Sequence, residues 1–162
     1  MAFSKDWSEW WRHFLGASPD GHRETIDILR QRYVEEIQAA VRFEQHAQEM
    51  QYPQFCEKLL HIALEKTKHA EWIAEKIIAL GGKLPEVPER WSTDENSWHY
   101  LVTNLEEENR SADHPPEQKW IIESEHPDIT PVLQRIDEEE KKYRGEIRKM
   151  LMRSDSFALS LA

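Results

Sequence analysis

Residues 25–50 read TIDILRQRYVEEIQAAVRFEQHAQEM and form one uninterrupted periodic stretch. Spacings of three and four residues alternate between the positions of one stripe, which are Ile26, Leu29, Tyr33, Glu36, Ala40, Phe43, Ala47 and Met50. Such spacing keeps side chains on one side of an α-helix and is typical of a helix packed in a bundle. The stripe contains one carboxylate, Glu36, and burying a charge is costly unless the charge is paired or binds a metal.

A second helix is predicted from Pro53 to Leu80, between the Gln51-Tyr52-Pro53 break and the Gly81-Gly82 pair. Its inward stripe is Ile62, Lys66, His69, Ile73 and Ile77. A lysine and a histidine therefore interrupt this apolar face. Glu36 lies roughly four helical turns before the first break and His69 roughly four turns after it, so antiparallel packing brings them to nearly the same height.

The segment Gly81 to Asn96 contains two prolines and no helical stripe, which predicts a crossover along the bundle. Ser92 and Glu95 resemble a capping box that starts a third helix. The inward stripe of this helix is Trp98, Leu101, Leu105, Glu108 and Ala112. Pro115-Pro116 cannot continue a helix, so we expect a break near Asp113 and a restart over residues 117–125.

A fourth helix follows His126-Pro127-Asp128. Its stripe is Ile129, Leu133, Ile136, Glu140, Tyr143, Ile147 and Met150. Each of the four helices thus places an ionisable residue in the middle of an apolar seam. The pattern predicts an all-α, four-helix bundle over residues 21–153, with a long crossover between its second and third helices and a polar centre.

The two ends of the chain differ from the bundle. Residues 1–20 include a Trp-rich amphipathic helix from Lys5 to Leu15, which we interpret as a lid on the bundle or as a docking surface for a partner or a membrane surface. Residues 154–162 have no stripe and are expected to form a flexible tail.

The composition excludes several classes of protein. The formal charge of -10, from 21 basic and 31 acidic residues, opposes binding to nucleic acid. Cys56 is the single cysteine, so the chain can form neither an internal disulfide nor a cysteine-based metal cage. The sequence also shows no secretory signal and no apolar run of the ~20 residues that span a bilayer. We expect a cytoplasmic protein.

The four polar positions match the way in which bundles build dinuclear carboxylate sites. Such a site uses one glutamate from each of two helices and a Glu-x-x-His pair from each of the other two. Residues three apart project from one face of a helix, so both members of a pair reach the same metal centre.

The chain resembles the ferritin-like superfamily, in particular its bacterioferritin and rubrerythrin-type members. The residues that carry the resemblance are Tyr33-Val34-Glu35-Glu36, Phe43-Glu44-Gln45-His46-Ala47, Lys68-His69-Ala70-Glu71-Trp72, Leu80-Gly81-Gly82-Lys83-Leu84-Pro85 and Asp137-Glu138-Glu139-Glu140. The resemblance implies a metal centre, with iron as the expected cofactor and Glu36, His69, Glu108 and Glu140 as its ligands.

Two departures from the family pattern modify this centre. Lys66-Thr67-Lys68-His69 stands where one Glu-x-x-His pair is expected, and Glu140-Lys141-Lys142-Tyr143 stands where the other is expected. Lys66 thus replaces a carboxylate and Tyr143 replaces an imidazole. Three states of the centre remain open, namely a metal-free network in which Lys66 acts as the cation, a site for one metal ion, and an intact dinuclear site. Glu65 lies off the stripe of the second helix and is not counted among the ligands. His46 lies beside the stripe of the first helix and is expected to be partly exposed.

The leading functional interpretation is a protein with an altered centre that works by binding a protein partner, a second copy of itself or a small ligand. The alternative is an oxidoreductase of the di-iron type, a ferroxidase, peroxidase or hydroxylase, with a working iron centre. The sequence identifies neither the partner nor a substrate.

Overall fold

The computed structural model describes residues 23–88 and 97–160, and the side chains of residues 23–88 and 99–154. The predicted helix at Lys5–Leu15 and the predicted capping box at Ser92 lie outside these ranges. Within them the chain forms helices α2 (Arg23–Glu49), α3 (Pro53–Ala79), α4 (Ser97–Ala112), α5 (Pro116–Glu125) and α6 (Thr130–Ser160). The described residues contain no strand, so the predicted all-α bundle is confirmed.

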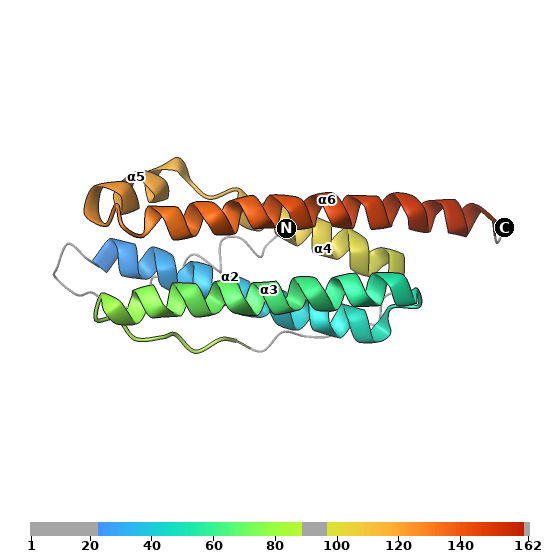
Figure 1. The fold of residues 1–162 in the computed structure, drawn as a ribbon, viewed down its shortest axis with the longest axis horizontal. Helices are drawn as coiled ribbons and strands as arrows, with labels where there is room; N and C mark the ends of the chain where they lie inside the picture. Colours follow the sequence, from blue (N-terminus) through green and yellow to red (C-terminus); the bar gives the residue numbers. More distant parts are fainter. Residues whose placement is uncertain (1–22, 89–96, 161–162) are drawn as a thin grey trace.

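The helices run side by side along one long axis (Figure 1). α2 and α3 form an antiparallel pair, and α6 extends along the bundle opposite them. α4 and α5 share the position of the third helix, because α5 lies beside the N-terminal end of α6 and α4 lies beside a later stretch of it (Figure 1). The predicted break between them is therefore confirmed, and Pro115-Pro116 lies at the start of α5.

Proline and glycine set the limits of α3. Tyr52 has the extended backbone that a following proline favours, and Pro53 begins the helix. At the other end Gly81 has a φ of 81°, which a side chain would strain. The Gly82 amide donates to the carbonyl of Ile77 and the Gly81 amide donates to that of Ile78, which is a Schellman motif.

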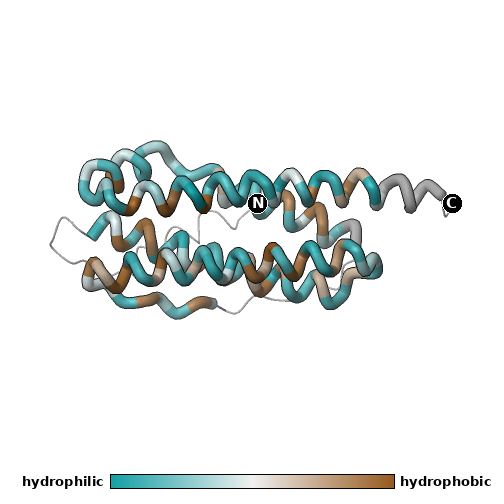
Figure 2. The backbone as a smooth tube through the Cα atoms, in the orientation of Figure 1, coloured by the Kyte–Doolittle hydropathy of each residue, from teal (hydrophilic) through white to brown (hydrophobic). Residues whose placement is uncertain are grey.

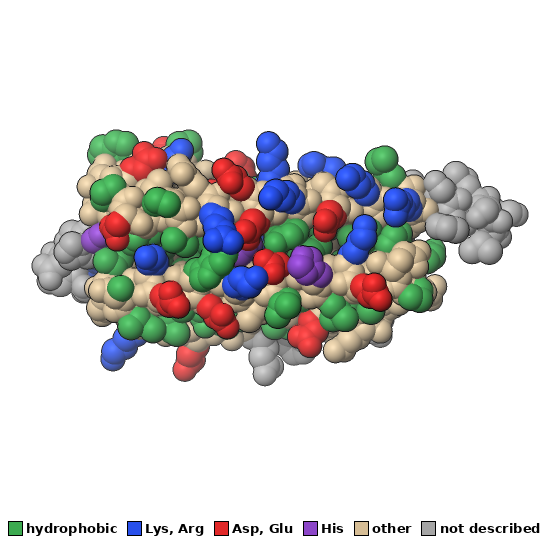
Figure 3. All heavy atoms as spheres, viewed as in Figure 1, with side chains coloured by type: hydrophobic (Ala, Val, Ile, Leu, Met, Phe, Trp, Pro, Cys, Tyr) green, Lys and Arg blue, Asp and Glu red, His purple; other side chains and the backbone are tan. Residues whose placement is uncertain are grey.

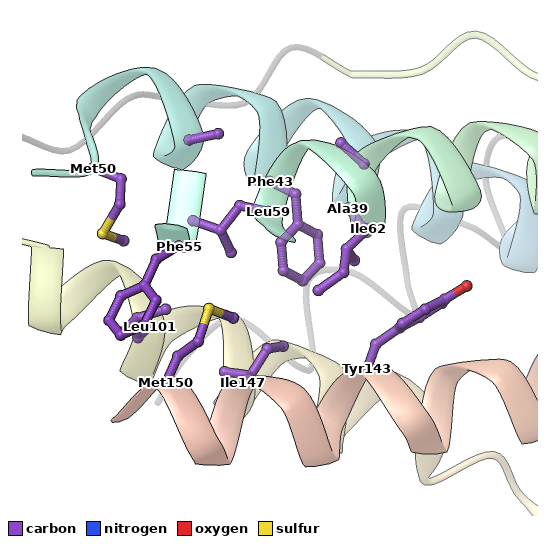
Figure 4. Packing of buried hydrophobic residues seen from close by; sticks show 12 residues of the cluster. Ala39, Phe43, Met50, Phe55, Leu59, Ile62, Leu101, Tyr143, Ile147 and Met150 are labelled. Atoms are coloured by element: carbon purple, nitrogen blue, oxygen red, sulfur yellow. The ribbon is translucent and has the colours of Figure 1, made fainter. Parts of the chain in front are cut away.

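The apolar core is divided into two clusters by a polar layer. One cluster includes Phe43, Phe55, Leu59, Leu101 and Ile147 (Figure 4). The other cluster includes Leu29, Ile73, Ile77, Ile122, Ile129 and Ile136. Hydrophobic residues recur along each helix in the bundle, separated by hydrophilic ones on the outer faces (Figure 2). The centre therefore lies midway along the bundle, with apolar packing on both sides.

The predicted stripes of α3 and α6 are buried at every position. The stripe of α4 is partly wrong, because Ala112 is exposed and Asn104 is buried instead. Ala112 is the last residue of its helix, where α4 gives way to the linker before α5. α6 continues to Ser160, past the start of the predicted tail at Ser154, and no proline or glycine in that stretch interrupts it. Among the described helices, none has the length and apolar content required to cross a membrane.

Candidate functional site

The polar layer brings together side chains from four helices. Glu36 comes from α2, Lys66 and His69 from α3, Glu108 from α4 and Glu140 from α6, and all five are buried. The 3–4 spacing of each stripe places these residues on the inward face of its helix. These five side chains meet in the structure, as predicted. The role of Glu36, His69, Glu108 and Glu140 as metal ligands remains a prediction.

Lys66 occupies the middle of the cluster. Its Nζ lies 2.6 Å from Glu140 Oε1, 2.7 Å from Glu108 Oε2 and 3.7 Å from Glu36 Oε2. Only 1% of the lysine side chain is exposed, so its ammonium group cannot turn out to water. Lys66 therefore joins carboxylates from three other helices.

Arg42 is a second buried cation that sequence reasoning missed. Its Nη2 lies 2.9 Å from Glu108 Oε1, and its Nε donates to Asn104 Oδ1 at 2.9 Å. Arg42 stands beside Phe43, outside the predicted stripe of α2. A second run on that helix, Thr25, Arg32, Ala39 and His46, repeats every seven residues and is also buried. This run contains three polar residues and one alanine and does not include Arg42, so hydrophobic periodicity gives no signal for the wider buried face of α2.

His46 belongs to this wider face, and its predicted exposure is wrong. Its side chain is buried and its ring stacks on Tyr100, with 4.4 Å between the ring centroids. The aromatic partner comes from α4, so only the packing of α2 against α4 determines this contact.

His69 connects the cluster to the seam between α3 and α6. Its Nδ1 lies 3.3 Å from Glu36 Oε2, and its Nε2 lies 2.7 Å from Glu139 Oε2. Glu139 precedes the predicted ligand Glu140 and lies on the partly exposed side of α6. The imidazole thus faces a carboxylate at each nitrogen, one inside the bundle and one near its surface.

Tyr143 joins the centre less directly than predicted. Its hydroxyl donates to Glu65 Oε2 at 3.4 Å, and its ring lies 6.3 Å from that of His69, measured between centroids. Glu65, which does not belong to the predicted inward stripe of α3, therefore faces His69 and Tyr143 from the partly exposed side of that helix. Lys68 Nζ also binds Glu65 Oε1 at 2.8 Å.

Burial and charge shift the pKa values of the central groups. Burial raises the pKa of Glu36 well above its ordinary value, and the nearby Glu140 carboxylate adds to the rise, whereas Lys66 opposes it. Burial would also raise the pKa of Glu140, but the Lys66 ammonium outweighs it and holds that pKa well below the ordinary value. The carboxylates around Lys66 likewise outweigh burial and raise the lysine pKa. These opposite shifts favour the protonated form at Glu36 and the charged form at Glu140.

Two groups of side chains in the described residues have ligand atoms close enough to bind a metal ion. One group is Glu36, His69 and Glu140, and the other is Glu65, His69 and Glu139. The ligand atoms within each group lie within 4.8 Å of one another. The first group is fully buried, whereas Glu65 and Glu139 in the second are partly exposed.

The order and packing of the described helices correspond to the ferritin-like fold. A solved structure described as a ferritin-like, diiron-carboxylate protein from Bacillus anthracis str. Ames is similar to this chain, with a TM-score of 0.74 and 18% identity. The similarity covers 83% of this chain and 99% of the other. No protein-family model matches the sequence, and no curated protein matches it.

Proposed function

We propose that this chain is a ferritin-like protein whose internal dinuclear site is replaced by a metal-free ionic network, and that it works through binding. The position of the Lys66 ammonium, 2.6 Å from Glu140 and 2.7 Å from Glu108, is the observation that carries the proposal. A dinuclear centre needs a carboxylate at this position. Lys66 instead supplies positive charge to the same carboxylates.

The balance of charge supports the proposal. Three acidic side chains, Glu36, Glu108 and Glu140, are buried in the centre. Lys66 and Arg42 are the two cations that bind them. The two cations offset most of the carboxylate charge without a metal, whereas two divalent ions would leave an excess of buried positive charge. The residues of the internal centre therefore do not fit a pair of divalent ions.

Metal analysis of untagged protein, purified without chelator, tests this proposal. We expect no ion whose retention depends on Glu108 or Glu140, and no oxygen consumption when ferrous iron is added. Glu138→Gln, at an exposed position of α6, serves as the control for Glu140→Gln. Two ions per chain that are lost in Glu140→Gln but kept in Glu138→Gln would contradict the proposal.

The alternative is an oxidoreductase that keeps one iron ion inside the bundle. The close approach of the ligand atoms of Glu36, His69 and Glu140 favours this second function. The same measurements separate the two functions, because an iron enzyme consumes oxygen in proportion to added ferrous iron and loses this activity in Glu140→Gln.

Exposed apolar side chains support the binding role. Leu60 and Leu64 lie one turn apart on α3 and are 44% and 64% exposed. We propose that this face binds a second copy of the chain. Sedimentation velocity is expected to show self-association that Leu60→Gln/Leu64→Gln weakens, whereas Leu84→Gln, at another exposed leucine, leaves it unchanged. A monomer at all concentrations would contradict self-association.

A further inference from the structure

We propose that Glu65, His69 and Glu139 form a site for one divalent transition-metal ion of the zinc type, on the seam between α3 and α6 and outside the internal centre. Figure 3 shows acidic, basic and histidine side chains gathered along this seam midway along the molecule. One imidazole nitrogen and two carboxylates are ligands that zinc, cobalt and manganese accept. This inference goes beyond the proposed function, which concerns the internal centre.

The ligand atoms are already close to binding geometry. Those of Glu65, His69 and Glu139 all lie within 4.8 Å of one another. Two ligands bound to one zinc ion at ~2.0–2.2 Å stand at most about 4.4 Å apart, so small rotations of the glutamate side chains close the site. The Tyr143 hydroxyl, which donates to Glu65 Oε2 at 3.4 Å, helps to hold that carboxylate in place.

The inner carboxylate of Glu36 orients His69 for this role. Its Oε2 lies 3.3 Å from Nδ1, where it can accept the Nδ1 proton and leave the Nε2 lone pair for a metal. Metal-binding histidines usually donate their other ring N–H to a carboxylate or carbonyl in this way. The ring is fully buried, so its direction is fixed, and Nε2 already faces Glu139 Oε2 at 2.7 Å.

Charge and exposure distinguish this seam from the internal centre. Glu65 and Glu139 together balance one divalent ion. Their present cation partners are Lys68, at 2.8 Å from Glu65, and Arg135, at 3.1 Å from Glu139. The side chains of Lys68 and Arg135 are 45% and 66% exposed, so both can turn into water at little cost in free energy. Lys66, which is buried, cannot leave the internal carboxylates in this way.

Calorimetric titration of the untagged full chain with zinc chloride, together with the absorption spectrum of added cobalt, tests the site. We expect one ion per chain, and an affinity at least tenfold weaker in both Glu65→Gln and Glu139→Gln. Glu71→Gln and Glu138→Gln remove the same charge at exposed positions of α3 and α6 and should bind as the wild type does. Lys68→Ala removes a competing cation and should tighten binding severalfold.

Three outcomes would overturn the inference. They are a wild type that binds neither ion, an equal loss of affinity in the control variants, and an ion that depends on Glu108 but not on Glu65. Far-UV circular dichroism of each variant checks that the helices are intact. Lys68→Ala is a second control, because misfolding would weaken binding and the expected result is tighter binding. Both the internal iron alternative and this site use His69, so the two proposals are separated by the carboxylates on which binding depends. Iron oxidation that depends on Glu140 would overturn the proposed function, whereas zinc binding that depends on Glu65 and Glu139 would still support this site.

Discussion

Lys66 shows how one side chain can change the chemistry of a buried centre. A glutamate at this position would add negative charge to the three carboxylates around it, and metal ions would have to balance that charge. The lysine balances it directly, and its raised pKa keeps it protonated. In the proposed metal-free network, charge rather than shape is therefore the main difference from a dinuclear site.

Lys66→Ala is expected to destabilise the protein by about 3–5 kcal/mol, because it leaves buried carboxylates without their cation. Urea denaturation of the wild type and the variant, with and without chelator, measures the loss. Lys68→Ala, at an exposed lysine two residues away, should cost much less. If the two variants are equally stable, Lys66 does not hold the network together. If the loss appears only with chelator, a metal ion balances the charge instead.

The junctions between helices provide tests at the scale of elements. A side chain at Gly82 would bring a Cβ atom to 2.8 Å from Ile26 Cγ2, because the residues after α3 pass close to α2. Gly82→Ala is therefore expected to destabilise the fold by about 1–3 kcal/mol. Gly145→Ala is the matched comparison, since nothing lies within 4 Å of its added Cβ and its glycine lies inside α6. That variant should gain about 0.5–1 kcal/mol. A Gly82→Ala variant that is at least as stable as the wild type in thermal unfolding would contradict the close approach.

The linker between α4 and α5 contains a group that responds to pH. Burial lowers the pKa of His114 to about 4, and the Arg32 guanidinium adds to the effect. The unfolded chain binds this proton near pH 6.5, so the free energy of unfolding should fall as the pH drops from about 6.5 to about 4. His114→Gln should remove this part of the pH dependence, and urea denaturation at pH 7 and pH 4.5 measures the difference. An unchanged pH dependence would show that His114 is not held neutral.

The bundle as a whole isolates the centre, because apolar clusters pack on both sides of the polar layer. Substitutions of the side chains in the polar layer are therefore expected to leave the apolar core intact. Lys66→Glu/Tyr143→His returns a Glu-x-x-His pair to both α3 and α6 and should increase the number of ferrous ions bound per chain in an anaerobic titration. Since Arg42 still binds Glu108, adding Arg42→Gln should increase that number again. Lys119→Glu/Tyr143→His is the control, with the same charge change at an exposed position of α5. An equal number of ions in all variants would mean that the cavity itself has closed.

The sequence by itself determined the helices and the height of the centre. Stripes in α3 and α6 were read from spacing alone, because the 3.6-residue period of a helix is a local property that burial of one face makes visible. The distances of Glu36 and His69 from the break between their helices predicted that the two lie at nearly the same height, and the stripes predicted a polar position in each of the other two helices. The Pro115-Pro116 break and the Gly81-Gly82 stop were readable for the same reason, since both depend on the local backbone.

Only the tertiary structure decided which flanking residues meet. Arg42 on α2 binds Glu108 on α4, and Glu139 on α6 binds His69 on α3. Neither Arg42 nor Glu139 lies on a predicted stripe. Tyr143 turned to Glu65 on α3, and His46 stacked on Tyr100 from α4. These contacts depend on how far the helices stand apart and how they are rotated against each other, and long side chains extend the reach of each helix beyond its stripe. Periodicity along one helix contains no information about these distances, so the partners of the central residues could be known only once the helices were packed.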